Sequence, residues 1–369
     1  MTDVVHFVHN LNDRTIAAVA RCLVRETQEQ GRSVVLVAGS VAAGADHPEG
    51  VQVIDLGGSG RKTLPTLRAL SRVLRRMAPQ VVFAHAEGPA RAAVLATRSM
   101  RNRPVVVGVV HNHHSSYPWS YPRIRRVVDG QLLPRLDALV GVSPGVATDL
   151  ATTFPALADR VHMIPAPLTR WAELEDLAAE SLYHPWFDDA RPVVVTVGHV
   201  HPRKDHETLL RAVVSLRAWG REVLVMIVGS ADGEHAAGIR RLVVQLGLQD
   251  HVALMGAITN PMPHIAAADV FVLSSRNEGL GIVLLEAMGV GTPIVSTDAP
   301  AGPRWVLQDG RAGLLTPVGD AEALATGIER VLGDAALRDR LTTVGRDRAE
   351  AFSPARITGQ HLALAERLR

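Results

Sequence analysis

Two glutamates in the second half of the chain, Glu278 and Glu286, have the residue type and the spacing to bind a polar ligand. They stand eight positions apart in the segment SSRNEGLGIVLLEAM, which covers residues 274–288. Carboxylates are poor ligands for phosphate but good acceptors for the hydrogens of hydroxyl groups. The start of a helix offers free backbone N–H groups that favour phosphate. Together these features suit a ligand that carries both groups, such as a nucleotide sugar.

The elements that must position these glutamates can be predicted from the same stretch. The apolar run Val270–Leu273 indicates a buried parallel strand, and Gly279 with Gly281 indicates a tight turn. Residues 282–288 have the apolar pattern of the first turns of a helix. This order places Glu278 in the loop after the strand and Glu286 a little over one turn inside the helix.

The motif resembles the paired-glutamate signature of the retaining glycosyltransferases of family 4, which have the GT-B fold. The resemblance is strong over residues 190–350 and weaker, although continuous, over the first 170. Other segments that carry it are GTPIVSTD at 291–298, GPR at 302–304, DG at 309–310, GLL at 313–315, VG at 197–198, PRKD at 202–205, Gly229 and Gly256. It implies a glycosyltransferase with two Rossmann-like domains that face each other across a cleft.

Apolar runs alternate with helical patterns in both halves, which predicts two doubly wound α/β domains with parallel sheets. The predicted strands cover residues 4–8, 34–37, 51–54, 81–84, 105–110, 138–142, 193–197, 223–228, 252–255, 270–273 and 294–296. The predicted parts are an N-terminal acceptor-binding domain at 1–170, an interdomain connection at 171–191, a nucleotide-sugar-binding domain at 192–350 and a C-terminal helix at 351–369. That last helix is expected to pack back on the N-terminal domain.

Composition narrows the class of protein. A chain of 369 residues is long for one hydrophobic core, so two domains are expected. No apolar run approaches the roughly 20 residues that span a bilayer, and the N-terminus lacks a signal pattern, so we expect a cytoplasmic protein. A single cysteine, Cys22, excludes an internal disulfide and a cysteine-based zinc site.

The resemblance assigns roles to residues of the second half. It implies that Lys204, with Arg203 beside it, neutralises a diphosphate leaving group. Where relatives have a further arginine this chain has His199, so either Arg203 takes that role or a protonated His199 binds phosphate. Glu286 is expected to accept hydrogen bonds from ribose hydroxyls, and Glu278 from hydroxyls of the transferred sugar.

Backbone groups complete the predicted donor site. The sugar and the distal phosphate are expected at Gly279, Leu280, Gly281 and Ile282. The base is expected near Gly229 and the loop that contains Ile258. The sequence does not separate uridine from guanosine there, and a UDP sugar is favoured. No cofactor is expected besides this donor substrate.

Histidines follow the predicted strand 105–110 in the first half. His111 directly follows the apolar run and resembles the family's active-site histidine, which contacts the donor sugar; His113 is the second choice. Histidines at 111, 113 and 114 could bind a metal, but no nearby carboxylate or cysteine completes a site, and the chain has no Asp-x-Asp motif. We therefore predict metal-independent transfer. The resemblance favours retention by a front-face route, in which the leaving phosphate takes the acceptor proton.

The acceptor is expected on the first half. Many relatives have a glycine-rich turn after the first strand, where this chain has His9, Asn10 and Asn12. These residues, together with His113, are the predicted acceptor contacts. Asn12 has a second interpretation, as the cap of the following helix.

Basic residues are concentrated in the first half, which has 20 Lys and Arg against 12 Asp and Glu in residues 1–170. They form no recognised nucleic-acid-binding module, so nucleic acid is not an expected partner. One face of a predicted helix carries Arg68, Arg72, Arg75 and Arg76. This is either an ordinary solvated face or, with Arg123, Arg125, Arg126, Tyr117, Trp119 and Tyr121, a surface for peripheral contact with anionic lipid headgroups.

These features lead to one favoured function and to alternatives. The favoured function moves a hexose or an N-acetylhexosamine to a hydroxyl of a saccharide or lipid-linked acceptor in envelope polysaccharide or glycolipid biosynthesis. One alternative is a natural-product glycosyltransferase with a small soluble acceptor. The other is a catalytically silent protein of the same fold that binds a sugar nucleotide.

Overall fold

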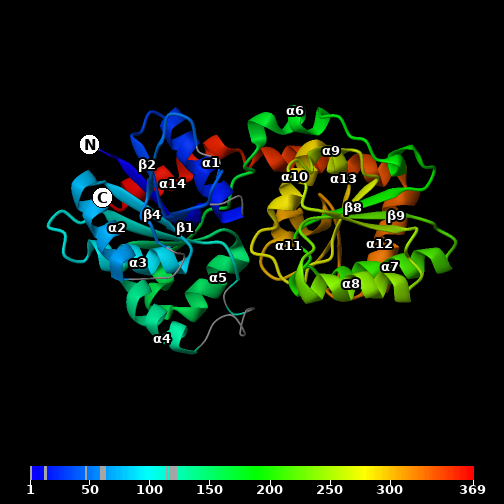
Figure 1. The fold of residues 1–369 in the computed structure, drawn as a ribbon, viewed down its shortest axis with the longest axis horizontal. Helices are drawn as coiled ribbons and strands as arrows, with labels where there is room; N and C mark the ends of the chain where they lie inside the picture. Colours follow the sequence, from blue (N-terminus) through cyan, green and yellow to red (C-terminus); the bar gives the residue numbers. More distant parts are fainter. Residues whose placement is uncertain (1, 12–14, 46–47, 59–63, 114, 116–122) are drawn as a thin grey trace. The chain divides into compact units, whose positions relative to one another are not determined.

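The computed structural model describes residues 2–11, 15–45, 48–58, 64–113, 115 and 123–369, with the backbone alone at 123–126. They form two compact units, one of Met1–Thr169 with Phe352–Arg369 and the other of Arg170–Ala351. Each unit has its own parallel sheet with helices packed around it (Figure 1). The chain therefore has two cores, as its length predicts.

The first unit is built on a parallel sheet whose strands, among the described residues, run in the order β3-β2-β1-β4-β5-β6-β7. Its strands are β1 (Val4–Leu11), β2 (Val34–Val41), β3 (Gln52–Asp55), β4 (Val81–His85), β5 (Val105–Val110), β6 (Ala138–Gly141) and β7 (Val161–Met163). Its helices are α1 (Thr15–Glu29), α2 (Leu64–Met77), α3 (Glu87–Thr97), α4 (Arg123–Leu132), α5 (Pro144–Thr153) and α14 (Pro354–Arg367), with 3-10 turns at Leu133–Arg135 and Pro155–Arg160.

Valine-rich runs explain why these segments form the buried strands of a parallel sheet. Strand β4, with the sequence VVFAH, is buried at every position, and β5, VVVGVV, at all but its first. A parallel sheet covered by helices needs such continuous apolar strands. The strand order changes direction between β1 and β4. Ligands of open α/β sheets bind at this switch point, beyond the carboxyl ends of the strands, which here are Leu11 and His85.

Helix α14 comes last in the chain and lies on the first unit. It contacts α1, and Arg32, just after α1, forms an ion pair with Glu366. The ring of His361 packs edge-on against Phe83 of β4, with 5.4 Å between the ring centroids. The structure thus assigns residues 352–369 to the unit that the first 169 residues form.

The second unit has a parallel sheet whose strands, within the described residues, run in the order β10-β9-β8-β11-β12-β13. Its strands are β8 (Val193–Val197), β9 (Leu224–Val228), β10 (Val252–Gly256), β11 (Val270–Leu273), β12 (Ile294–Thr297) and β13 (Leu314–Thr316). Its helices are α6 (Leu174–Ala179), α7 (His206–Ala218), α8 (Gly233–Gln245), α9 (Met262–Ala266), α10 (Ile282–Val290), α11 (Pro303–Val306), α12 (Ala321–Gly333) and α13 (Ala335–Glu350), with 3-10 turns at Trp171–Glu173, Pro185–Asp188, Pro202–Lys204 and Gln308–Gly310.

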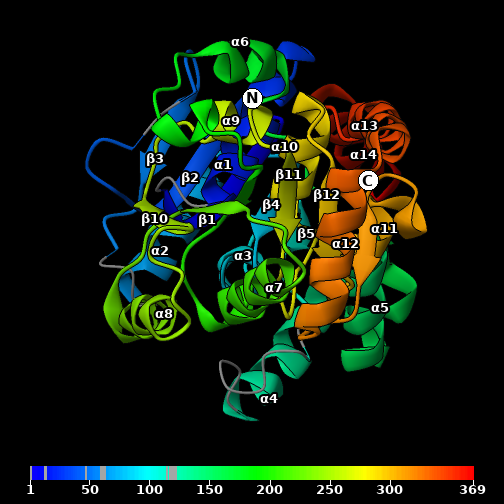
Figure 2. The same ribbon diagram turned by 90° about the vertical axis from the view of Figure 1, so that its right-hand side faces the viewer.

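The core of the second unit joins its sheet to neighbouring helices. Figure 2 shows α7 and α12 side by side, and the two helices are in contact. Their buried side chains, such as Leu209 and Ile328, pack in one cluster with Val194 of β8 and Val272 of β11. The strand order changes direction between β8 and β11, so the switch point of this unit lies where those strands end.

Two features differ from the sequence prediction. Residues 171–191, expected as a connection, are part of the second unit. Their helix α6 contacts α9 and α10, Leu174 is buried, and the side-chain amide of Asn260 donates to the carbonyl of Leu177 at 2.8 Å. The edge strands β7 and β13 were not predicted, because each has only three residues, too few for a recognisable apolar run.

Candidate functional site

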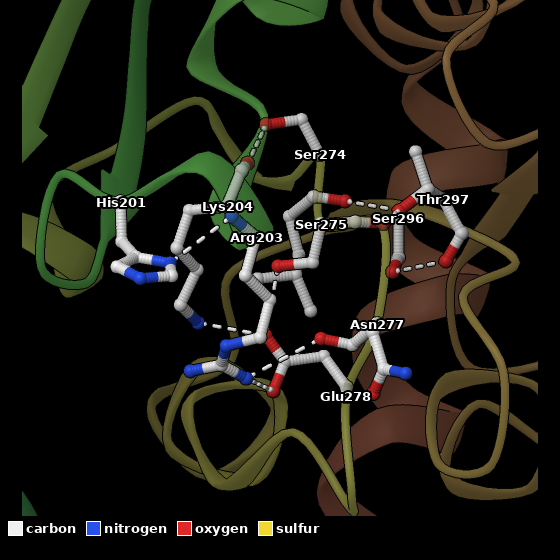
Figure 3. Close-up of polar contacts among 10 residues, drawn as sticks. His201, Arg203, Lys204, Ser274, Ser275, Asn277, Glu278, Ser296 and Thr297 are labelled. Atoms are coloured by element: carbon white, nitrogen blue, oxygen red, sulfur yellow. Dashed lines mark hydrogen bonds and ion pairs between the residues drawn. The ribbon is translucent and has the colours of Figure 1, made fainter. Parts of the chain in front are cut away.

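Hydrogen bonds join the loop that follows β8 to the loop that follows β11, beyond the ends of these strands (Figure 3). The hydroxyl of Ser274 donates to the carbonyl of Lys204 at 2.9 Å. The backbone N–H of Arg276 donates to the carbonyl of Arg203 at 2.8 Å. Each bond involves a backbone atom, so together they fix where the side chains of both loops begin. The two loops form the switch point of the second unit.

Glu278 lies at the centre of these loops and is 5% exposed. Its Oε1 accepts hydrogen bonds from the ammonium of Lys204 at 2.8 Å and from the hydroxyl of Ser275 at 2.7 Å. Its Oε2 accepts one from the guanidinium of Arg203 at 3.0 Å. Both carboxylate oxygens therefore have donors from the protein, and one acid holds two cations in place (Figure 3).

The surrounding charges keep Glu278 ionised. Burial by itself raises the pKa of this carboxyl, but the attraction of Lys204 and Arg203 outweighs burial and leaves the pKa below its ordinary value. A carboxylate has about four acceptor positions, and Lys204, Arg203 and Ser275 use three of them. The sequence predicts that Glu278 accepts hydrogen bonds from a sugar; in this arrangement one position is left for that purpose.

Two glycines, Gly198 and Gly229, allow close approaches just beyond the ends of β8 and β9. A Cβ added at Gly198 would lie 2.8 Å from Cε of Lys204. A Cβ added at Gly229 would lie 2.1 Å from the carbonyl oxygen of Gly198, a backbone atom that cannot move aside easily. The backbone N–H of Gly229 also donates to the carbonyl of Gly256 at 2.8 Å. The ends of β8, β9 and β10 are thus close together, and Ile258 follows, half-buried, in the next loop.

The start of α10 is a second part of the site. Gly281, the residue before the helix, has a left-handed backbone with φ of 85°, and no side chain caps the helix. Glycine adopts this conformation without a steric penalty. A Cβ at Gly302 would lie 2.3 Å from the carbonyl oxygen of Leu280, so this glycine packs directly on the turn. The residues predicted to hold sugar and phosphate, Gly279–Ile282, form this turn and the first residue of the helix.

Glu286 differs from Glu278 in its surroundings. It is half-buried on α10, and no hydrogen bond or ion pair to it occurs within the part of the chain that the structure describes. Burial raises its pKa to about 7, although the charges of Arg170 and Lys204 act in the opposite direction. A half-buried carboxylate that makes no contact with a protein donor is suited to accept hydrogen bonds from a ligand.

His199 follows Gly198 in the loop after β8. The ring is exposed, and its Nδ1 is 2.5 Å from the hydroxyl oxygen of Ser230. His201, which the sequence prediction omitted, accepts a hydrogen bond from the backbone N–H of Arg203 at 3.2 Å. Arg203 lies next to Lys204, because both bind Glu278.

A chain of histidines crosses the switch point of the first unit. Nδ1 of His6 in β1 is 3.0 Å from Nε2 of His85 at the end of β4. Nδ1 of His85 is 3.4 Å from Nε2 of His111, just after β5. His6 and His85 are buried, and His111 is half-buried. The predicted active-site histidine is therefore the outermost of three linked rings.

The other predicted residues of the first unit come from the end of β1 and from the loop after β5. His9 is half-buried near the end of β1, and Oδ1 of Asn10 accepts a hydrogen bond from the hydroxyl of Ser40 at 2.6 Å. Nδ1 of His113 is 3.9 Å from Oδ2 of Asp149. Asn12 lies outside the described residues. The structure thus links His111 to other histidines, whereas the predicted acceptor contacts do not bond to one another where they are described.

Besides His201, the sequence prediction missed Ser275, His6 and His85, which the structure brings into these sites. A signal for His85 was present, because it ends the apolar run VVFA at 81–84 just as His111 ends the run at 105–110. Ser275 and His6 had no comparable signal. A serine three positions before a glutamate is common, and a histidine inside an apolar strand is usually a core residue.

The described residues also bear on metal sites, membrane spans and basic surfaces. They contain no group of three or more His, Cys, Asp or Glu side chains placed to bind a metal ion. No helix in the described ranges has the length and apolarity needed to cross a membrane.

On α2, Arg68, Arg72, Arg75 and Arg76 are all exposed. The other members of the predicted basic and aromatic surface, Tyr117, Trp119 and Tyr121 and the side chains of Arg123, Arg125 and Arg126, lie outside the described residues.

Two protein-family models match the chain, and together they cover most of it. The model described as Glycosyl transferases group 1 matches residues 185–348, which include the whole site of the second unit. The model described as Glycosyltransferase Family 4 matches residues 16–168 of the first unit. The two matches correspond closely to the two structural units.

Curated relatives and solved structures agree with these models. The chain is 39% identical over 174 residues to the lipopolysaccharide core biosynthesis glycosyltransferase LpsE of Rhizobium meliloti, a match of 47% of this chain and 49% of LpsE. It is 29% identical over 266 residues to the GDP-mannose-dependent alpha-(1-6)-phosphatidylinositol monomannoside mannosyltransferase of Mycobacterium tuberculosis, a match of 69% of this chain and 66% of that enzyme. The first match thus spans about half the length of the relative.

Among solved structures, HepE of Anabaena in complex with UDP and glucose superposes with a TM-score of 0.82 and 18% sequence identity, covering 100% of both chains. At this identity the likeness concerns the fold alone. That fold is GT-B, as the resemblance in the sequence implies.

Proposed function

The chain belongs to glycosyltransferase family 4, and from this membership we propose that it is a retaining, metal-independent glycosyltransferase. Its donor is a nucleotide diphosphate sugar, with a UDP sugar favoured, that carries a hexose or an N-acetylhexosamine. Its acceptor is a hydroxyl of a saccharide or lipid-linked molecule in envelope polysaccharide or glycolipid biosynthesis. The names of LpsE and of the mycobacterial mannosyltransferase support this class of acceptor.

The observation that carries the proposal is the group formed by Glu278, Lys204 and Arg203. Glu278 fixes two cations at the switch point of the second unit. Fixed cations stabilise charge that develops during a reaction, because they need no reorganisation at that moment. In this reaction the developing charge is on the diphosphate. Lys204, with 12% of its side chain exposed, still has ammonium hydrogens beyond the one that Glu278 accepts.

In the proposed reaction the bond between the anomeric carbon and the diphosphate oxygen breaks, and the nucleoside diphosphate leaves with both bonding electrons. The acceptor hydroxyl attacks the anomeric carbon from the same face. Its proton passes to the leaving phosphate oxygen, so that atoms and charge balance without a protein nucleophile. Lys204 and Arg203 stabilise the leaving group, and His111 is proposed to contact the donor sugar.

The nucleotide is proposed to lie along the end of the sheet of the second unit. Its ribose hydroxyls donate to Glu286, the half-buried carboxylate without a partner among the described residues. Its distal phosphate accepts from the backbone at the start of α10, where no side chain caps the helix. Its base lies near Gly229 and Ile258.

A panel of donors tests the proposal. A ligand that binds only the native state raises the melting temperature by mass action. UDP-glucose, UDP-galactose and UDP-N-acetylglucosamine are compared with GDP-mannose, since the mycobacterial relative is named for GDP-mannose and the HepE structure contains UDP. The expected result is a shift with a UDP sugar that exceeds the shift with GDP-mannose. A larger shift with GDP-mannose would reverse the nucleotide assignment, and no shift with any donor would contradict the proposal.

Slow donor hydrolysis separates an enzyme from a silent binding protein, because water can replace a missing acceptor. Wild type is expected to release UDP from the donor that it binds, and Lys204→Met is expected to slow that release by about 100- to 1,000-fold while donor binding is still detectable. Binding without release in wild type would favour the silent alternative. Once an acceptor is found, the anomeric configuration of the product, read by NMR, tests retention.

A further inference from the structure

An apolar cavity of about 290 Å³ lies in the first unit, apart from the charged site of the second. Its wall includes Phe7 and His9 of β1 and Gly88 at the start of α3. Most of its surface is aliphatic and comes from α2, α3 and α4, through Leu67, Leu70, Pro89, Leu95, Val128 and Leu132. Its volume is close to the lower end of the range for small-ligand pockets, roughly 300–1,000 Å³.

The same helices carry most of the large apolar side chains that are exposed on this unit. Leu64 of α2 is 68% exposed, Leu95 of α3 is 39% exposed, and Val127 and Val128 of α4 are 66% and 41% exposed. In the described part of the unit, Met163 is the other large apolar residue that is exposed. Exposed apolar side chains that gather around a cavity indicate a site for an apolar partner.

The lining decides which chemistry fits. A saccharide buried here would leave hydroxyls without partners, and each such group costs free energy when it is removed from water. The guanidinium of Arg91, the charged group in the wall, already forms an ion pair with Asp129. The mostly aliphatic wall therefore suits a hydrocarbon chain. The exposed arginines Arg68, Arg72 and Arg75 on the same helix α2 suit the anionic headgroup or membrane surface to which such a chain is attached.

We propose that this cavity holds the hydrocarbon end of the acceptor, so that the acceptor is a lipid-linked molecule rather than a small soluble one. The proposal rests on the proposed function, in which the first unit binds the acceptor. It selects one of the acceptor classes that the function leaves open. The binding itself requires neither donor nor turnover, so it can be tested apart from catalysis.

Alkyl glucosides of increasing chain length provide the test, by isothermal titration calorimetry below the micelle concentration. Each methylene that enters the cavity is expected to tighten binding by up to roughly fourfold. Octyl glucoside is therefore expected to bind at concentrations at which methyl glucoside does not, with a negative heat-capacity change. Equal affinity for methyl and octyl glucoside would overturn the proposal. Tighter binding of naphthyl glucoside than of octyl glucoside would overturn it in favour of a flat aromatic acceptor.

Two variants test whether octyl glucoside binds in this cavity. Ala92→Leu adds bulk to the wall and is expected to lower the affinity for octyl glucoside at least tenfold. Its control is Ala18→Leu, at another half-buried helical alanine of this unit, which is expected to leave that affinity unchanged. Leu64→Asn changes a 68% exposed side chain and carries little risk for folding. It is expected to weaken binding severalfold, and Val244→Asn, at a 60% exposed position of the second unit, is its control. Unchanged affinity in both cavity variants would contradict the assignment to this cavity, whatever the outcome of the donor experiments.

A different set of contacts supports a second inference, on the three linked histidines. A neutral imidazole donates one hydrogen bond and accepts one. Burial keeps these rings neutral, since it lowers the pKa of His6 to about 3 and that of His111 to about 4, and lowers that of His85 as well. For His111 burial is the largest cause, followed by Glu87, which raises the pKa, and by His361 of α14, which lowers it.

The buried ring of His6 decides in which direction the hydrogen bonds between the three histidines run. Nε2 of His6 is buried and has no partner among the described residues. An unpaired buried N–H is more costly than an unpaired acceptor, so the proton of His6 belongs on Nδ1, where it can be donated to Nε2 of His85. His85 then has its own proton on Nδ1 and donates to Nε2 of His111. His111 is left with its proton on Nδ1, as a donor.

We infer that His6 and His85 are positioning residues that fix His111 in the tautomer with the proton on Nδ1. In the proposed function, which this inference presupposes for its catalytic consequence, His111 then offers an N–H to a sugar oxygen. The tautomer itself is a property of the free protein and is measured without substrate.

Nitrogen-15 NMR of the histidine side chains tests the inference, with the His111 signal assigned by loss in His111→Gln. The expected spectrum shows His111 protonated at Nδ1 in wild type and in His85→Asn, whose amide still donates, and a mixture of tautomers in His85→Phe. His361→Phe changes a buried histidine that is not one of the three linked rings. It is expected to leave the tautomer of His111 unchanged. A wild-type His111 protonated at Nε2, or a tautomer that is the same in His85→Phe, would overturn the inference.

Discussion

The switch points of the two units have the same topology but opposite chemistry. In the second unit the strand ends carry a buried ionised acid, Glu278, paired with Lys204 and Arg203. In the first unit the strand ends carry the neutral rings of His85 and His111, and an aliphatic cavity lies nearby. One fold can therefore provide a charged site and an uncharged one, because function depends on the loops rather than on the sheet.

The difference follows from what each site has to do in the proposed reaction. A diphosphate that gains charge as it leaves needs cations that are already fixed, and a buried acid is the means of fixing them. An acceptor that must enter, react and leave needs a site without strong charge. Neutral histidines can bond to hydroxyls without holding ions there. The experiments below test this contrast.

Glu278→Gln should have the largest effect, because it leaves Lys204 and Arg203 without their counter-charge. Removing one partner of a buried ion pair costs about 3 kcal/mol of unfolding free energy. The folded-state pKa of Glu278 is depressed, so its contribution is present above the unfolded pKa and is lost as the pH falls through the folded value. Urea unfolding followed by tryptophan fluorescence measures it, since Trp171, Trp186, Trp219 and Trp305 all belong to the second unit.

The control for this variant is Glu207→Gln, which breaks an exposed pair with Arg211 on α7. An exposed ion pair contributes at most about 1 kcal/mol, so this control should unfold almost like wild type. If Glu278→Gln were as stable as Glu207→Gln, the acid would not hold the cations, and the contrast between the two switch points would fail.

Lys204→Met should reduce catalysis more than it reduces donor binding. Loss of one fixed group that stabilises developing charge lowers kcat by about 100- to 1,000-fold. KM for the donor should change less, because Arg203 and the backbone at the start of α10 still bind phosphate. Steady-state UDP release gives both constants, and Arg211→Met on the exposed surface is the control. A rise in KM with an unchanged kcat would show that Lys204 only binds the donor.

Glu286→Gln should make the second unit more stable in mild alkali. The folded-state pKa of about 7 is above the ordinary 4.5, so the burial of Glu286 favours the fold at low pH and opposes it as the pH rises through 7. The variant is expected to gain about 1–2 kcal/mol at pH 8 and nothing at pH 4. UDP affinity should change with pH between 6 and 8 in both proteins, because the terminal phosphate of UDP loses its second proton at about pH 6. Wild type should show an additional rise through pH 7 that the variant lacks. Glu350→Gln, at an exposed acid, is the control for stability.

His361→Phe should reduce the acid sensitivity of the first unit. Burial lowers the pKa of His361 to about 4 from 6.5, so the neutral ring contributes stability above pH 6.5 that is lost as the pH falls towards 4. Between pH 6.5 and pH 4 the free energy of unfolding is therefore expected to fall by about 1 kcal/mol less in the variant than in wild type. Hydrogen exchange of peptides from α14 and β4 measures it, and peptides of the second unit serve as the internal control. Equal acid sensitivity of wild type and variant would count against a neutral buried His361.

The exposed arginines of α2 should have the smallest effect on stability. Replacing Arg68, Arg72, Arg75 and Arg76 with Gln is expected to change the unfolding free energy by less than about 1 kcal/mol, because the side chains are exposed. Binding to vesicles of anionic phospholipid at low salt should fall markedly, and wild-type binding should weaken as salt is added. If wild type did not bind such vesicles, the solvated-face interpretation of α2 would stand.

The sequence by itself determined the two α/β units, most of their strands and the segment that carries Glu278 and Glu286. Apolar runs and glycine turns are local signals, and chemistry that lies within one segment is visible in that segment. It also determined that Lys204 and Arg203 follow a strand end. Its limits were equally local, since the three-residue strands β7 and β13 have no recognisable pattern.

Tertiary structure alone decided which side chains meet. Lys204 and Glu278 are 74 positions apart, and His6 and His85 are 79 positions apart, so no spacing along the chain predicts either contact. Parallel strands bring their carboxyl ends to one edge of the sheet, and the strand order decides which ends become neighbours. The same assembly decided that Glu278 is paired, whereas Glu286 has no partner among the residues that the structure describes. Two identical side chains in one motif thus acquire pKa values shifted in opposite directions.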